Sequence, residues 1–107
     1  MSACFVYITA GDAAEARKIG RILVEERLVA CANVQDHVTS IYRWEDEVKE
    51  ETEAVLVAKS VADRLPAVID RVKALHSYDC PCIVSWALSG GNPDFLDWLA
   101  TESVENP

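Results

Sequence analysis

The sequence lacks any hydrophobic run long enough to cross a bilayer, and it has no low-complexity tract and no internal repeat. A membrane-spanning helix needs about 20 consecutive apolar residues. The first residues contain no basic segment, and Asp12 follows before a signal-peptide core could form. We therefore expect a cytoplasmic protein without a membrane partner, in which the four cysteines are reduced thiols.

Basic residues are scarce. Ten Lys and Arg stand against 18 Asp and Glu, which gives a formal net charge of −8. Proteins that bind the phosphate backbone cluster Lys and Arg on one face, whereas here these residues are outnumbered and scattered. We expect no nucleic-acid partner. The length of 107 residues, half of them hydrophobic, predicts a single globular domain over residues 1–107.

Apolar residues recur with the periods of strands and helices, and the order of these segments predicts the fold. Asp12, with Glu15 three residues later, predicts the N-cap of the first helix, and Asn92-Pro93 predicts the start of the last. The order is that of an α+β ferredoxin-like sandwich, βαββαβ, with a C-terminal helix. The predicted strands are 3–9, 30–44, 48–59 and 80–88, with a hairpin turn at 45–47. The first predicted helix is 12–28. The second has its buried residues within 65–75 and is capped by Ser60 or Asp63, and a short third helix follows Asn92.

The predicted hairpin is too long for one small domain. A strand from Cys31 to Trp44 would extend about 45 Å, whereas a compact domain of this length is about 34 Å across. Residues 35–37 are the expected place of a bulge, and Ile41 and Tyr42 lie near the tip, where an unpaired edge would expose apolar surface. We therefore predict an obligate homo-oligomer held by sheet between subunits. The alternative is a shorter strand with a folded-back loop.

Other functions of this fold need motifs that are missing here. Residues 9–12 (TAGD) place an acid where a phosphate-binding enzyme of this fold would need an arginine. The same loop lacks the Cys-x-x-Cys of a metallochaperone, and the chain has only two histidines and no nucleophile elbow. We expect no enzymatic activity and no organic cofactor.

Three soft metal ligands lie close together in the sequence: His76, Cys80 and Cys82. Residues two apart on a strand point to the same side, so the two thiols could converge on one ion, with His76 at the end of the preceding helix. Thiolate and imidazole ligands favour Cu(I) or Zn(II), so copper or another divalent metal ion is the expected cofactor. The alternative is that these residues only pack, since cysteine is often buried as a small hydrophobe.

Tyr42, Trp44, Glu45 and Lys59 form a second candidate site. Aromatic rings with a charged pair are what a cleft at a subunit boundary needs for apolar contact and for orienting a ligand. The alternative is that the two aromatic residues only pack at an interface. The acidic residues within 45–51 are either a solvated hairpin tip or a cation site.

Several motifs resemble the CutA family of divalent-cation tolerance proteins, and together they cover nearly the whole chain without a gap. They are residues 23–34 (LVEERLVACANV), 40–45 (SIYRWE), Lys59-Ser60, His76-Ser77-Tyr78 with Pro81, and 95–99 (FLDWL). The resemblance implies a ferredoxin-like fold and a homotrimer with sheet pairing between subunits. It also implies a role in tolerance of copper and other divalent metals, and kinship with PII-type signalling trimers.

The chain departs from the family pattern at its metal ligands. Cys82 stands where the family usually has glutamate, and Ile8 and Leu75 stand where some members have a ligand cysteine and histidine. Of that ligand set only His76 carries over. The expected function is a homotrimeric tolerance protein that binds or senses copper-type ions. The alternative is a PII-like trimeric scaffold that binds a small ligand or a partner protein in its intersubunit clefts.

Overall fold

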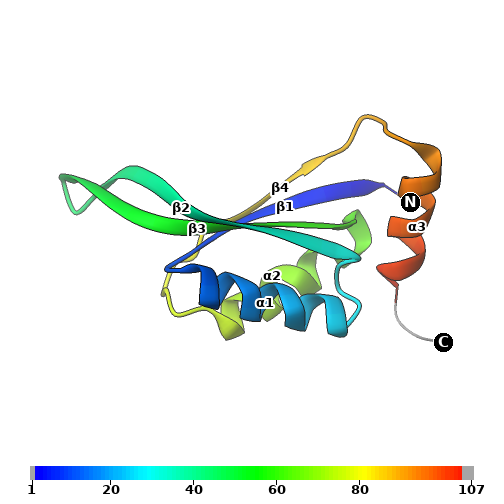
Figure 1. The fold of residues 1–107 in the computed structure, drawn as a ribbon, viewed down its shortest axis with the longest axis horizontal. Helices are drawn as coiled ribbons and strands as arrows, with labels where there is room; N and C mark the ends of the chain where they lie inside the picture. The colour runs from blue at the N-terminus through cyan, green and yellow to red at the C-terminus, as the bar shows by residue number, and fades with distance from the viewer. Residues whose placement is uncertain (1, 105–107) are drawn as a thin grey trace.

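The computed structural model describes residues 2–104 as a four-stranded antiparallel sheet with two helices packed on one face (Figure 1). The elements are β1 (Ala3–Ala10), α1 (Ala13–Glu25), β2 (Cys31–Trp44), β3 (Glu47–Val61), a short 3₁₀ turn (Ala62–Arg64), α2 (Leu65–Leu75), β4 (Ile83–Ala87) and α3 (Pro93–Glu102). The strand order is β2-β3-β1-β4, and α3 lies at the end of the sheet away from the hairpin tip (Figure 1). The predicted ferredoxin-like α+β sandwich is confirmed.

The core lies between the sheet and the two covering helices. Alternate residues of β1, among them Val6 and Ile8, are fully buried toward α1 and α2. Gly20 of α1 sits so close to β3 that a Cβ atom there would come within 3.0 Å of a methyl group of Leu56. The helix can approach the sheet this closely because glycine has no side chain. No helix within residues 2–104 is long and apolar enough to span a membrane.

The opposite face of the sheet has no helix over it in the described part of the chain (Figure 1). Phe5 and Tyr7 of β1 pair there with Trp86 and Val84 of β4. The Phe5 and Trp86 rings meet edge to face, with centroids 5.8 Å apart. Trp86 is 46% exposed and Val84 is 54% exposed, so a single chain leaves an apolar surface in water.

β2 and β3 pair along their length and extend beyond the rest of the sheet, so that the molecule measures 46 × 26 × 21 Å (Figure 1). Glu45 and Asp46 form the turn with φ angles of 50° and 64°, as in tight two-residue hairpins. The predicted turn was one residue too long, because Glu47 already belongs to β3. The long hairpin is confirmed, and the folded-back alternative is wrong.

The predicted bulge is also confirmed, since the pairing register shifts between Gln35 and Val38. It decides which side chains of the hairpin share a face. Before the bulge, odd-numbered residues of β2 lie opposite odd-numbered residues of β3, and after it Ser40 lies opposite Glu51. Because neighbouring residues of a strand point to opposite faces, Tyr42 and Trp44 share the face of Glu51.

Two helix boundaries differ from the prediction. α1 ends at Glu25 because Arg27 adopts a left-handed φ of 60°, which no helix can continue. Neither Ser60 nor Asp63 caps α2, which begins at Leu65 without a side-chain cap. Ser60 is instead buried in β3, and its hydroxyl donates a 2.7 Å hydrogen bond to the carbonyl of Leu28.

Candidate functional site

A pocket of about 550 Å³ opens between the hairpin and the loop that joins α2 to β4. Its lining comes from the end of β1, the distal halves of β2 and β3, and residues 78–82 of the loop. The lining residues are Thr9, Ser40, Tyr42, Trp44, Lys49, Glu51, Glu53, Tyr78, Asp79, Cys80 and Cys82. The structure thus joins parts of the two predicted sites in one pocket.

The predicted aromatic cleft is only half assembled. Tyr42 and Trp44 line the pocket, whereas Glu45 and Lys59 do not. Glu45 lies in the turn at the hairpin tip. Lys59 pairs at the level of Cys31, near the opposite end of the hairpin, with its Nζ 5.5 Å from the centroid of the Phe5 ring.

Two tyrosines hold two carboxylates in the pocket. Tyr42 Oη donates a 2.5 Å hydrogen bond to Glu51, and Tyr78 Oη donates a 2.7 Å hydrogen bond to Glu53. The hydrogen bond to Glu51 raises the pKa of Tyr42, and burial together with Glu53 raises the pKa of Tyr78. A phenol with the ordinary tyrosine pKa of about 10 is already protonated at neutral pH. One of the two oxygens of each carboxylate accepts a hydrogen bond from its tyrosine.

Glu53 and Tyr78 were missed as site residues in the sequence. A signal was present, because Lys49, Glu51 and Glu53 alternate along β3 and so share one face. The contribution of Tyr78 comes from a loop that approaches β3 only in the folded chain, because Tyr78 follows Glu53 by 25 positions in the sequence.

Cys80 and Cys82 lie on the loop before β4, not on a strand as predicted. β4 begins at Ile83, because Pro81 has no N–H to donate to a ladder. Both thiols are free, and both line the pocket. Burial raises the pKa of the Cys82 thiol, and the negative charge of Glu53 raises it further. A hydrogen bond with Thr9 lowers the pKa, but the net effect is an increase.

The three-ligand metal centre predicted for His76, Cys80 and Cys82 is not assembled. No group of three or more His, Cys, Asp or Glu side chains in residues 2–104 is arranged to hold a metal ion. His76 has a fully buried side chain and does not line the pocket. Its Nε2 lies 2.7 Å from the carbonyl oxygen of Thr9, and its Nδ1 accepts a 3.0 Å hydrogen bond from the Tyr78 N–H. Both ring nitrogens are therefore engaged in positioning the loop.

Glu15 supports the same loop from α1. The predicted N-cap is confirmed, since the Glu15 N–H donates to the Asp12 carboxylate at 2.8 Å. The Glu15 carboxylate accepts from the Gly11 N–H at 3.0 Å and from the Ser77 N–H at 2.8 Å. Burial opposes ionisation of Glu15, but the hydrogen bonds from Ser77 and Gly11 and the proximity of His76 lower its pKa overall.

The chain is similar to known proteins over nearly its whole length. The family model described as "CutA1 divalent ion tolerance protein" matches residues 4–102. The chain is 47% identical over 94 residues to "Divalent-cation tolerance protein CutA" of Thermus thermophilus, a match that covers 88% of this chain and 91% of that protein. It is 39% identical over 101 residues to the protein of the same name from Archaeoglobus fulgidus, which covers 94% of this chain and 97% of that protein.

Solved structures agree with these matches. The Thermus thermophilus divalent cation tolerance protein (Cut A1) has a TM-score of 0.93 at 43% identity, covering 95% of this chain and 99% of that chain. CutA1 from Oryza sativa has a TM-score of 0.95 at 30% identity, covering 99% of this chain and 97% of that chain.

Proposed function

The chain belongs to the CutA1 family of divalent ion tolerance proteins, and from that premise we propose that it is a homotrimer that binds copper-type ions and so contributes to divalent-cation tolerance. The observation that carries the proposal is the family match over residues 4–102. The relatives' names describe tolerance and not a reaction, and the proposed role is binding without a catalytic step.

We propose Cys80 and Cys82 as the metal ligands, because both thiols line one pocket and thiolates select Cu(I) or Zn(II). The carboxylates of Glu51 and Glu53 add negative charge beside them, which favours a cation over an anion. Metal binding would displace the thiol protons. The protein would act in the cytoplasm, where such thiols stay reduced.

The homotrimer is supported by two features of the single chain. The hairpin extends beyond its own sheet, and Val84 and Trp86 lie exposed on the sheet face without helices. Sister chains would cover this apolar surface and pair with the hairpin edge, and the number of three follows the family resemblance.

Titration with Cu(I) under reducing conditions tests the proposed ligands. We expect the wild type and Cys31→Ser to bind equally, since Cys31 lies outside the pocket. The double variant Cys80→Ser/Cys82→Ser should lose the site and should fail to protect a copper-sensitive host. Equal affinity in the wild type and the double variant would refute the proposed ligands.

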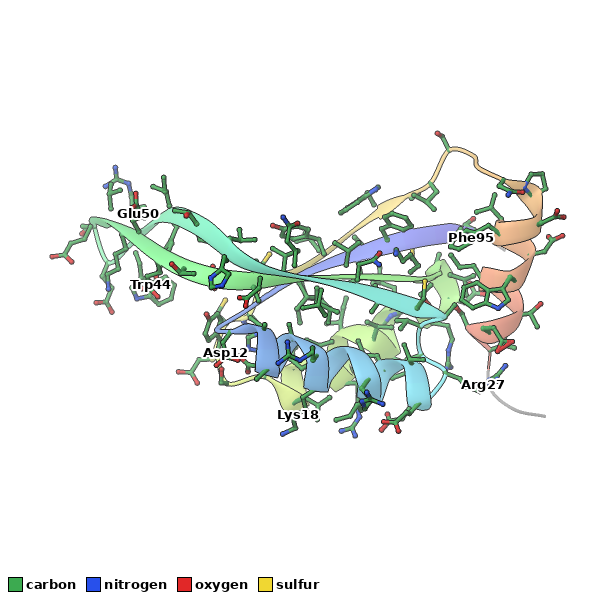
Figure 2. The ribbon with its side chains drawn as sticks, in the orientation of Figure 1. Asp12, Lys18, Arg27, Trp44, Glu50 and Phe95 are labelled. Carbon is green, nitrogen blue, oxygen red and sulfur yellow. The ribbon has the colours of Figure 1, made fainter. Side chains whose placement is uncertain are left out.

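Sedimentation velocity tests the assembly. We expect a particle of about three times the 11.8 kDa chain mass, and we expect Trp86→Glu to dissociate it. Lys18→Glu is the control, because Lys18 lies on the helical layer, away from the exposed sheet face (Figure 2). A folded wild-type monomer at micromolar concentration would contradict the proposal.

A second candidate function is a PII-like scaffold that binds a small organic ligand. The size of the pocket favours it, because about 550 Å³ falls within the range of roughly 300–1,000 Å³ that is typical of small-molecule sites. A thermal-shift screen separates the two functions, since any ligand specific to the folded state raises the apparent stability. A shift with metabolites and none with any metal would favour the scaffold.

A further inference from the structure

The pocket between the hairpin and residues 78–82 combines negative charge with apolar surface. Its lining holds three acidic side chains, Glu51, Glu53 and Asp79, and one basic side chain, Lys49, which gives a net charge of −2. The whole chain carries −8. A lining of this charge concentrates cations and repels anions.

Aromatic rings stand beside these carboxylates. Tyr42 and Trp44 lie two residues apart on β2 and share a face, and Tyr78 enters from the loop. The face of an aromatic ring attracts a cation, most strongly in the case of tryptophan. Trp44 is 52% exposed in the single chain, so the residues of its own chain leave about half of this side chain uncovered.

The polar groups of the pocket are arranged before any ligand arrives. The hydroxyls of Tyr42 and Tyr78 are committed to Glu51 and Glu53, at 2.5 Å and 2.7 Å respectively. These bonds hold the carboxylates near the rings and leave each of them a second oxygen. Such preorganisation lowers the entropy cost of binding.

We propose that this pocket binds an organic cation, namely a small molecule with an ammonium group on an apolar body. The ammonium group would lie against the carboxylates of Glu51 and Glu53, and the apolar body would lie on Trp44. A volume of about 550 Å³ accommodates such a molecule, whereas a single metal ion needs far less space. This inference rests on the second candidate function, the small-ligand scaffold, and names the chemical class of its ligand. It uses the carboxylates and rings of the pocket and does not need the thiols.

Calorimetric titration with benzyltrimethylammonium tests the proposal, in buffer that contains a chelator to exclude metal ions. Benzyl alcohol and benzoate are the neutral and anionic comparisons. We expect binding of the ammonium compound, weaker binding of the alcohol and none of benzoate. Equal binding of all three compounds, or of none, would overturn the proposal.

Matched variants locate the site. Glu51→Gln should weaken binding of the ammonium compound about tenfold, which corresponds to about 1.4 kcal/mol. Glu50→Gln removes the same charge from the same strand, but its side chain points to the side of the hairpin opposite Trp44 (Figure 2), so it should bind as the wild type does. Equal weakening by both variants would show attraction by net charge alone and would refute the site.

Two further comparisons separate this inference from the proposed metal function. Trp44→Leu should lose most binding of the ammonium compound and Trp44→Phe should retain most of it, because only the second keeps a ring. The double variant Cys80→Ser/Cys82→Ser should keep the organic cation and lose Cu(I). If the wild type binds Cu(I) but not the ammonium compound, the organic-cation site is refuted and the metal function stands. If it binds the ammonium compound but not Cu(I), the metal function is refuted and the organic-cation site stands.

Discussion

The backbone N–H of Ser77 donates a 2.8 Å hydrogen bond to Oε2 of Glu15, across 62 residues of sequence. The other carboxylate oxygen accepts from the Gly11 N–H. One side chain thus fixes the start of α1 and the start of the loop that carries Cys80 and Cys82. The pocket depends on a residue that does not line it.

Glu15→Gln should be less stable than the wild type at neutral pH, by about 1–2 kcal/mol. Burial alone would raise the pKa of Glu15, but hydrogen bonds from Ser77 and Gly11 lower it below the usual value of 4.5. The stabilisation is therefore fully present above pH 4.5 and is lost as the pH falls through the lower folded-state pKa. Urea unfolding of both proteins across this range checks it. A stability difference that stays constant with pH would contradict the prediction.

His76→Ala should destabilise the fold by about 2–3 kcal/mol, because it removes a buried ring and leaves the Thr9 carbonyl without its donor. His76→Gln should lose less, since its amide can still donate to Thr9. Neither change should alter the stoichiometry of Cu(I), because the ring does not line the pocket. Denaturation and metal titration measure the two effects. Loss of Cu(I) from a folded His76→Gln protein would make His76 a ligand after all.

Arg27→Ala should loosen the end of α3. The Arg27 guanidinium donates to the carbonyls of Val104 and Thr101 at 2.8 Å and 3.0 Å, which satisfies acceptors that a helix end leaves open. We expect a loss of about 1–2 kcal/mol and faster amide exchange over α3, with Lys18→Ala as the unaffected control. Unchanged exchange in Arg27→Ala would show that the packing of Leu99 alone holds the helix.

His37→Val should destabilise the hairpin by about 1–2 kcal/mol, whereas His37→Gly should match or exceed the wild type. The reason is the φ of 56° at His37, a left-handed conformation that glycine adopts freely and a β-branched residue resists. Thr39→Val, in the regular part of β2, is the control. Thermal unfolding of the three variants measures the effect, and equal losses from valine and glycine at position 37 would argue against it.

Local chemistry made much of the fold predictable. Asp12 and Asn92 cap their helices as expected, because these caps use atoms only a few residues away. The bulge at 35–37 was expected because a strand this long must bend or extend beyond its own core. The early end of α1 was missed because Arg27 adopts the left-handed conformation that glycine usually supplies at a helix end. The Leu28 N–H donates to the Leu23 carbonyl and the Arg27 N–H donates to the Val24 carbonyl, each at 3.0 Å, which closes the helix locally.

The site was less predictable because it is assembled from distant segments. The pairing register could have excluded Lys59 from the site of Tyr42 and Trp44. A turn at 45–46 sets Trp44 opposite Glu47, whereas Lys59 lies opposite Cys31 at the other end of the hairpin. The burial of His76 could not be inferred in this way. Its partner Thr9 lies 67 residues away, and no spacing in the sequence indicates that contact.

The two sides of the pocket have unequal support. The 78–82 side is tied to the body of the molecule through His76 and Glu15. The hairpin side consists of β2 and β3 alone, where they extend beyond the rest of the sheet (Figure 1). Any contact that fixes the position of the hairpin therefore also sets the width of the pocket between it and residues 78–82. A ligand bound between the two sides and a sister chain paired with the hairpin would both restrict the same two strands. By thermodynamic reciprocity each would then strengthen the binding of the other to the same degree.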